Sequence, residues 1–323
     1  MKLLIPGGAG YIGSHMVKYA QSEGHEVVVL DDFSTGHEWA IKDCEILNVN
    51  LLDADRLSRL LKNSHFDGVI HFAAKSLVPE SIKKPNLYYH NNFTGTLNLV
   101  NEMIKNNINN LVFSSTAAIF GIPISENINE DHPKEPINPY GASKLMVERM
   151  LNDASKAYGI NVTCLRYFNA AGAHKSSEIG EDHDPETHLI PNILNSLLSG
   201  NIFNIYGDDY STKDGTCIRD YIHVMDLAEA HLLSLKKMNP KKLFDTFNLG
   251  NGKGYSIFEI INSCEKVSNL KLNYEVHDRR LGDPSFLISD SSKAYKELDW
   301  NPKFVNLDDI IESAFNWHKG RQL

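Results

Sequence analysis

The chain has 323 residues, of which 42% are hydrophobic and 23% are charged, and its formal net charge is -9. This composition is ordinary for a globular protein, and the length exceeds what one core usually covers, so two lobes are expected. The acidic balance and the lack of a Lys/Arg block argue against a nucleic-acid partner. No apolar window approaches the length of a membrane span, so no membrane partner is expected either.

The cysteines indicate a reducing compartment. Cys44, Cys164, Cys217 and Cys264 are far apart and form no C-x-x-C pair, which argues against disulfides and structural zinc. The first residues contain only a short apolar run, shorter than a signal peptide needs. We therefore expect a cytoplasmic protein.

The amino-terminal half alternates between two kinds of segment. Short runs rich in β-branched residues predict strands at 2–6, 25–31, 68–73 and 110–114, and helical patterns lie at 11–22, 54–62, 91–106 and 145–158. Such alternation predicts βαβ units and an α/β fold with a doubly wound parallel sheet of the Rossmann type.

The pattern changes after Phe168. Residues 172–188 are polar and predict a long loop, and mixed short elements follow it. We expect a Rossmann domain over 1–168 and, over 169–323, mainly a smaller mixed α/β substrate lobe, with some segments returning to the first lobe.

A glycine-rich loop follows the first strand. Gly7, Gly10 and Gly13 permit a tight turn and close approach of a pyrophosphate to the helix that begins there. Asp31 ends the second strand, where an acid can bind the adenosine ribose, and Asp32 follows it. Two carboxylates would repel a 2′-phosphate. This context favours NAD binding over a purely structural βα turn. Pro6 lacks an N–H group and is expected at the end of its strand.

Tyr140 and Lys144 are spaced to share one helix face. A nearby ammonium and a positive nicotinamide would lower the pKa of the tyrosine, making it a general base for an alcohol. Thr116 ends the strand upstream and could bond the reacting oxygen. Y-x-x-x-K alone occurs often by chance, so the prediction depends on the dinucleotide site. Ser114 and Ser115 could equally be strand-end caps.

Longer motifs resemble the extended short-chain dehydrogenase/reductase family, and within it the UDP-glucose 4-epimerases (also called UDP-galactose 4-epimerases). The resemblance runs nearly end to end. It is carried by Gly-Gly-Ala-Gly-Tyr-Ile-Gly-Ser-His (7–15), His-Phe-Ala-Ala (71–74), Asn-Pro-Tyr-Gly-Ala-Ser-Lys-Leu (138–145), Leu-Arg-Tyr-Phe-Asn (165–169), Asp-Gly-Thr-Cys-Ile-Arg-Asp-Tyr-Ile-His-Val (214–224) and Arg-Arg-Leu-Gly-Asp-Pro (279–284).

The resemblance implies a tightly held NAD and inversion at C4 of a UDP-hexose. Tyr140 would take the 4-hydroxyl proton while Thr116 holds that hydroxyl and Lys144 keeps the tyrosine acidic. Hydride would leave C4 and return to the opposite face of a 4-keto sugar that has turned over.

The same resemblance assigns the binding residues. The expected NAD contacts are Gly7, Gly10, Tyr11, Ile12, Gly13, Asp31, Asp32, Asn50, Leu51, Phe72, Ala73, Ala74, Asn92, Ser114, Tyr140, Lys144 and Phe168. The expected substrate contacts are Thr116, Asn169, His188, Leu189, Tyr206, Arg219, Tyr221, Arg280 and Asp283. An arginine fork matches phosphate oxygens. A surface salt bridge with a local aspartate is the alternative for Arg219 and Arg280.

Some positions depart from the family pattern. The lysine that many relatives have at Ser76 stands one place earlier, at Lys75. Asn50 occupies a place where an acid is common, and His188 replaces an asparagine that contacts the pyrophosphate in some members. Leu287 falls where a large or a small residue tunes room for an N-acetyl group, so substrate breadth stays open.

Other functions share this scaffold. Ala117 and Ala118 stand where a 4,6-dehydratase needs its elimination acids, which argues against that enzyme. A simple alcohol dehydrogenase would not need the phosphate-type arginines, and a non-catalytic NAD sensor would not need the Tyr/Lys pair. An epimerase of N-acetylated UDP-hexoses, or another NAD-dependent nucleotide-sugar enzyme, is the remaining alternative. The family also implies a homodimer through helices that include 91–106 and 145–158.

Two histidines in the loop over 172–188 are candidate metal ligands. His183 and His188 lie among Glu181, Asp182 and Asp184, but their spacing matches neither H-E-x-x-H nor a zinc pattern. We therefore expect a solvated loop and no metal.

Overall fold

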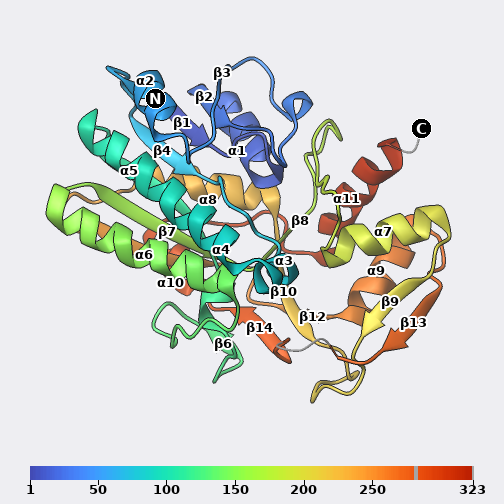
Figure 1. The fold of residues 1–323 in the computed structure, drawn as a ribbon. Coiled ribbons are helices and arrows are strands. Elements are labelled where there is room, and N and C mark those ends of the chain that lie inside the picture. The colour runs from blue at the N-terminus through green and yellow to red at the C-terminus, as the bar shows by residue number, and fades with distance from the viewer. Residues whose placement is uncertain (280–282, 322–323) are drawn as a thin grey trace.

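A computed structural model describes residues 1–279 and 283–321. Its larger lobe is built on a parallel sheet of seven strands, in the order β11-β7-β5-β4-β1-β2-β3 (Figure 1). The strands are β1 (Lys2–Pro6), β2 (Glu26–Asp31), β3 (Glu45–Asn48), β4 (Gly68–His71), β5 (Asn110–Thr116), β7 (Asn161–Tyr167) and β11 (Phe244–Leu249). The predicted doubly wound α/β fold is confirmed, because the strand order reverses between β1 and β4.

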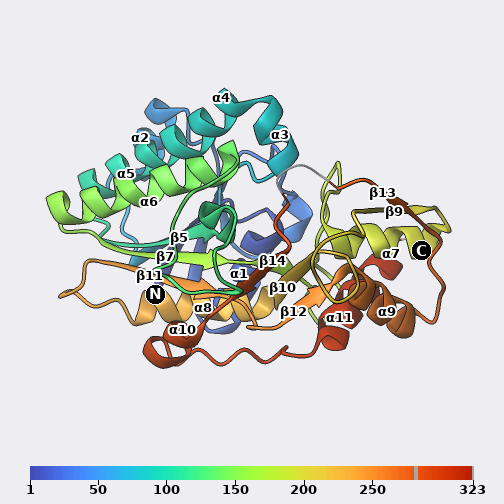
Figure 2. The same cartoon turned by 90° about the horizontal axis from the view of Figure 1, so that it is seen from below.

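Helices cover both faces of this sheet and bury a separate apolar core on each side (Figure 2). One face is covered by α1 (Tyr11–Ser22) and α8 (Val224–Lys236), and the other by α2 (Ala54–Leu61), α5 (Gly95–Lys105) and α6 (Pro139–Tyr158). Strands buried on both faces must be apolar throughout, which explains the β-branched runs in the sequence.

Several short elements connect these layers. They are η1 (Glu38–Ala40), α3 (Val78–Lys83), α4 (Pro85–Tyr88), the π-helical segment η2 (Tyr89–Thr94) and η3 (Ala117–Phe120). The helix predicted over 91–106 is therefore a π-helical segment followed by α5.

The smaller lobe contains two small sheets and a group of helices. The first sheet contains β6 (Asn127–Ile128), β8 (Asn169–Ala171), β10 (Ile218–His223), β12 (Gly254–Ser256) and β14 (Phe286–Ser289), and the second contains β9 (Phe203–Tyr206) and β13 (Tyr274–His277). The helices are α7 (Leu189–Ser199), α9 (Ile257–Ser268), α10 (Ser292–Glu297) and α11 (Leu307–Arg321). A third apolar core joins α7, α9 and α11, whereas α10 lies beside β11 of the large sheet.

Capping residues fix the ends of the helices that matter for the site. The Asn138 side chain accepts a hydrogen bond from Gly141 N at 2.9 Å, and Pro139 occupies the first turn, so α6 begins there. The helix predicted from residue 145 thus starts earlier and includes Tyr140 and Lys144. Among the described residues, no helix has both the length and the apolar content needed to cross a bilayer.

Candidate active site

The glycine-rich loop lies where the carboxyl ends of β1, β2 and β4 meet. Gly7 N donates to Leu30 O at 2.8 Å, and Phe72 N and Ala73 N both donate to Pro6 O, at 2.8 and 3.0 Å. Pro6 ends β1 as predicted, and its carbonyl joins the first strand to the segment after β4. These bonds place the loop at the reversal of strand order, which is the usual ligand crevice of such sheets.

The loop leaves no space for side chains on the side that faces the sheet. A Cβ on Gly7, whose φ is +78°, would lie 2.3 Å from Ala73 N, and one on Gly13 would lie 2.1 Å from Gly7 O. The first α-helical bond of α1 is Ser14 N to Gly10 O, so the preceding N–H groups of Tyr11, Ile12 and Gly13 have no partner within the helix. This arrangement fits a dinucleotide pyrophosphate.

A groove extends from this loop along the edge of the sheet. It is lined by nine of the predicted cofactor residues: Gly7, Gly10, Asp31, Asp32, Asn50, Leu51, Phe72, Ala73 and Ala74. Sequence reasoning did not assign the other lining residues, which are Leu30, Ser34, Thr35, Gly36, Val49, Lys75 and Asn91. Val49 directly follows β3, and Ser34, Thr35, Gly36 and Lys75 lie in the segments after β2 and β4. The place of these segments at the carboxyl ends of strands was the available signal.

Two acidic side chains in the groove, Asp31 and Asp32, are fixed by hydrogen bonds. The Asp31 carboxylate accepts hydrogen bonds from Ala9 N and Phe33 N, both at 2.9 Å, and thus ties β2 to the glycine-rich loop. Burial raises the pKa of Asp31, and these N–H groups offset part of that effect. Asp32 accepts from Asn50 Nδ2 at 2.5 Å. Asn50 therefore holds Asp32 in place, and its own carbonyl oxygen accepts from Leu52 N at 2.8 Å.

Asn92 holds the chain segment that forms one wall of the groove. Its side chain accepts from Lys75 N at 2.8 Å and donates to Lys75 O and to Ser143 Oγ, each at 3.0 Å. Two of these bonds fix the Lys75 backbone, and the third ties Asn92 to α6. Asn92 therefore positions the groove wall at Lys75. Lys75 lines the groove itself.

The predicted catalytic residues converge at the end of β5. The Tyr140 side chain is hydrogen-bonded to that of Thr116, and a Cβ on Gly141 would lie only 2.4 Å from Ala118 O. The glycine therefore allows α6 to approach the chain after β5 closely enough for the tyrosine to reach the threonine. Burial raises the pKa of Tyr140, and the bond with Thr116 lowers it in part.

Lys144 lies one helical turn from Tyr140 and is buried. Its Nζ donates to Ser114 O at 2.7 Å and lies 4.7 Å from the centre of the Phe113 ring. Burial lowers the pKa of Lys144 to about 7. An ammonium group has three donors, so this bond leaves two for a ligand.

Two further predicted cofactor residues lie beside this centre. The Ser114 hydroxyl is hydrogen-bonded to the Tyr167 hydroxyl, so its side chain is engaged within the protein. Phe168 is buried in a small apolar cluster that Leu287 also contacts.

The predicted substrate residues lie mainly on β10 and its neighbours. Arg219 Nη1 donates to Ile218 O at 2.9 Å and to Pro284 O at 2.8 Å, and its Nη2 lies 3.4 Å from Asp283 Oδ1. Arg219 therefore does form the ion pair with a local aspartate, Asp283. It is not a simple surface salt bridge, because the Arg219 side chain is mostly buried and two backbone carbonyls hold its guanidinium. Arg280 lies outside the described residues.

The remaining predicted substrate residues occupy three places. Tyr221 pairs with Asn169 between β10 and β8, and its side chain is buried in the core of the smaller lobe. Tyr206 ends β9 with its ring 5.7 Å from that of His277. His188 precedes the first residue of α7, Leu189.

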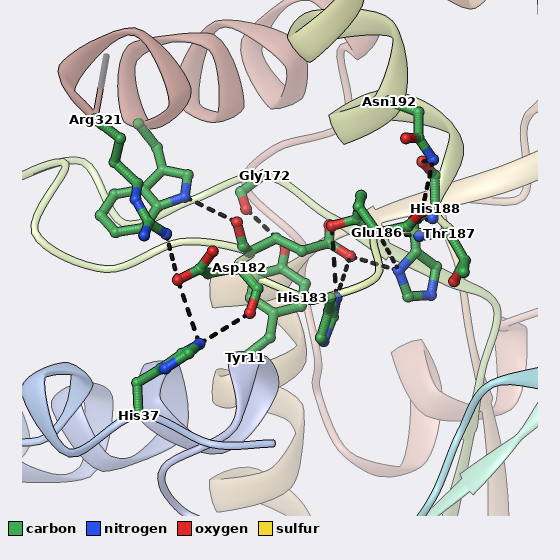
Figure 3. A network of polar contacts seen from close by, with 12 residues as sticks. Tyr11, His37, Gly172, Asp182, His183, Glu186, Thr187, His188, Asn192 and Arg321 are labelled. Atoms are coloured by element: carbon green, nitrogen blue, oxygen red, sulfur yellow. Dashed lines mark hydrogen bonds and ion pairs between the residues drawn. The ribbon is translucent and has the colours of Figure 1, made fainter. Parts of the chain in front are cut away.

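The loop over 172–188 is an irregular segment, as predicted, and it is solvated only in part. Lys175, Ser176, Glu178, Asp184, Pro185, Thr187 and His188 are exposed, whereas Ile179, Gly180 and Glu181 are buried. Glu181 is only 4% exposed, and its carboxylate faces His183 and His188. Glu186 lies beside the same two histidines and completes the group (Figure 3). Burial would lower the histidine pKa values, but the carboxylates outweigh it and raise them to about 9 for His183 and about 10 for His188. The polarity of the sequence gave no sign that tertiary contacts would bury Glu181.

Comparison with known proteins identifies the family. The UDP-glucose 4-epimerase of Lactobacillus helveticus is 51% identical over 321 residues, covering 99% of this chain and 97% of its own. A solved UDP-glucose 4-epimerase from Brucella ovis in complex with NAD is 42% identical, with a TM-score of 0.93 and 97% of both chains covered. One from Bifidobacterium longum, in complex with NAD+ and UDP, is 35% identical, with a TM-score of 0.95, covering 100% of this chain and 99% of the other. Because residues 3–250 also match the family as a whole, this chain belongs to the NAD dependent epimerase/dehydratase family.

Proposed function

We propose that this protein is an NAD-dependent UDP-hexose 4-epimerase that interconverts UDP-galactose and UDP-glucose. The observation that carries the proposal is the convergence of Tyr140, Thr116 and Lys144 on the end of β5, at the same sheet edge as the dinucleotide groove. The names of the relatives at 41–51% identity support the same activity.

The residues of the groove fit NAD. The N–H groups at the start of α1 would bind the pyrophosphate, Asp31 and Asp32 would face the adenosine ribose, and Lys144 would bind the nicotinamide ribose. When bound, NAD supplies the hydride acceptor and donor for C4 and a positive charge near the tyrosine. The two carboxylates disfavour the additional 2′-phosphate of NADP.

Side chains of the protein would transfer the proton of the sugar 4-hydroxyl. Thr116 would hold the 4-hydroxyl of the sugar, and the Tyr140 phenolate would remove its proton and later return it to the 4-keto sugar. Burial opposes a phenolate in the protein alone, so the bond with Thr116 and the cations of the complete site are needed to form it.

The smaller lobe would hold the nucleotide while the hexose turns over. Arg219 is suited to the phosphates because backbone carbonyls fix its guanidinium and occupy only some of its five donors. Retention of the diphosphate would let the freed 4-keto sugar present its opposite face without leaving the enzyme.

A second candidate activity is epimerisation of N-acetylated UDP-hexoses. Leu287 lies opposite Arg219 on the neighbouring strand β14 and contacts the apolar cluster that contains Phe168. A leucine of intermediate size at this place is compatible with either substrate class, so both belong in the first assay.

We further propose a cytoplasmic homodimer that pairs through α5 and α6. The four free cysteines suit a reducing compartment. Met146 on α6 is 40% exposed and gives this surface an apolar component. Light scattering of the purified protein should give twice the chain mass, and a mass of one chain would reject the dimer.

Incubation of the purified protein with UDP-galactose, without added NAD, tests the activity. We expect UDP-glucose to form and NAD to be released when the protein is denatured. If no UDP-glucose forms with UDP-galactose and no corresponding product forms with the N-acetylated substrate, although NAD is present in the protein, the proposal is wrong.

A further inference from the structure

We propose that Glu181, His183, Glu186 and His188 form a binding site for one zinc-like divalent transition-metal ion beside the glycine-rich loop. One ligand atom from each of these four residues lies within 4.8 Å of the other three. None of the four residues lines the dinucleotide groove, whereas His188 is also one of the expected substrate contacts. Metal binding can be measured without the proposed reaction.

The spacing of the ligand atoms suits a tetrahedral ion. Ligands about 2.0–2.2 Å from zinc at tetrahedral angles lie about 3.3–3.6 Å from one another. Here His183 Nδ1 lies 3.2 Å from Glu181 Oε1, and His188 Nδ1 lies closer to the same oxygen, at 2.6 Å. The two imidazoles approach different oxygens of Glu186: His183 Nδ1 lies 3.7 Å from Oε2, and His188 Nδ1 lies 3.3 Å from Oε1. Small side-chain movements would place all four around one centre.

Unsatisfied polar atoms point to a missing ligand. Glu181 is 4% exposed, and its Oε1 lies 3.2 Å from His183 Nδ1 and 2.6 Å from His188 Nδ1. Within residues 1–279 and 283–321, neither Oε1 nor His183 Nδ1 has a hydrogen bond of good geometry, so these atoms are held only by charge. A buried polar atom without a hydrogen bond is costly, and a metal ion bound by both atoms would remove that cost.

The donor set suits zinc in particular. Imidazole nitrogens bind zinc readily, carboxylate oxygens complete such sites, and the two negative charges balance one divalent cation. With four protein ligands the tetrahedral sphere is full and offers no position for a reacting water, so the role is structural.

The surrounding contacts show what the ion would hold. The Glu181 carbonyl accepts from Trp317 Nε1 at 2.9 Å, and Asp182 contacts His37 and Arg321, so the loop is anchored on α11 and on the segment after β2 (Figure 3). The His183 ring lies 6.3 Å from that of Tyr11, the first residue of α1. Metal binding would therefore fix the loop and the start of α7 against the helix that follows the glycine-rich loop.

The competing interpretation is an ion-pair cluster in which protonated histidines face the carboxylates. That cluster would bind no metal, so direct binding measurements distinguish the two. The full-length protein is freed of metal with a chelator, dialysed and titrated with Zn²⁺ by calorimetry, with retained zinc counted after gel filtration. Substitution by Co²⁺ adds a spectroscopic test, because tetrahedral Co²⁺ absorbs strongly in the visible region.

We expect one zinc ion per chain and a higher Tm with zinc. His183→Gln and Glu186→Gln should each weaken binding by at least about 100-fold, because loss of even an outer-shell partner can cost that much. His174→Gln, a histidine of the same loop outside the cluster, should bind like the wild type. The proposal is overturned if the wild-type chain retains no stoichiometric zinc, or if both variants, shown to be folded by circular dichroism, bind it unchanged.

Discussion

Lys144 Nζ donates a 2.7 Å hydrogen bond to the carbonyl oxygen of Ser114, two residues before Thr116 on β5. This bond therefore joins β5 to α6 close to the contact between Tyr140 and Thr116. The bond fixes the lysine against the strand end, while two of its donors remain for a ligand. The catalytic geometry depends on this junction between β5 and α6.

Tyr140→Phe should keep the fold and the bound NAD but lower kcat by about 100-fold to about 10,000-fold, the usual contribution of a positioned general base. Tyr158→Phe is a matched control, because that tyrosine ends the same helix and is 63% exposed. Steady-state kinetics and the NAD content of both variants measure the effect. Full activity of Tyr140→Phe would remove the residue from the mechanism.

Lys144 should make the stability of the NAD-free protein depend on pH. Burial lowers its pKa to about 7 from 10.5, so between these values the unfolded chain binds a proton that the folded chain does not. The contribution of Lys144 to the free energy of unfolding is therefore lowest below pH 7. It rises by up to about 1.4 kcal/mol per pH unit as the pH increases from about 7 to 10.5.

Urea unfolding at a series of pH values across that window measures this slope. Lys144→Met should remove most of the rise seen in the wild type, because the variant has no ammonium group to desolvate. Parallel pH profiles for the two proteins would contradict the assigned effect of burial.

Gly141→Ala should disturb the reaction centre without touching a reacting group. The new Cβ would lie 2.4 Å from Ala118 O and push the start of α6 away from the chain after β5. A displacement of about 1 Å can cost about 100-fold in rate, so we expect a loss of that order in kcat. Gly320→Ala, in open space on α11, should leave kcat unchanged. An unaltered kcat in Gly141→Ala would show that the close approach is not required.

Leu287→Ser should widen the substrate range. Removal of the leucine side chain opposite Arg219 would open space beside the sugar, and we expect the ratio of kcat/KM for UDP-N-acetylgalactosamine over UDP-galactose to rise about tenfold. Leu270→Ser, at an exposed position, serves as the control. If the ratio stays constant, Leu287 does not limit room for the N-acetyl group.

The sequence was most informative where local signals agree. The boundaries of β1 and α1 follow from an apolar run, a glycine turn and a helical pattern, and all match the structure. The helical pattern from residue 145 predicts a later start of α6 than the structure has, because Asn138 and Pro139 begin the helix before the apolar pattern becomes visible. Their capping chemistry could have located the helix.

Long-range packing accounts for what the sequence did not reveal. The edge strand β11 joins β7 although the whole of α7 and α8 separates them in the chain, and no local pattern specifies such a pairing. Likewise, the polar run around Glu181 resembles a solvated loop, and contacts with distant residues such as Trp317 accompany the burial of Glu181.

The central claim is that hydride leaves C4 of the sugar and returns to it within one active site. Epimerisation of UDP-galactose carrying deuterium at C4, in ordinary water and without added NAD, tests this most directly. We predict UDP-glucose that keeps the deuterium at C4. Replacement of the deuterium by hydrogen from water, or no formation of UDP-glucose, would contradict the account.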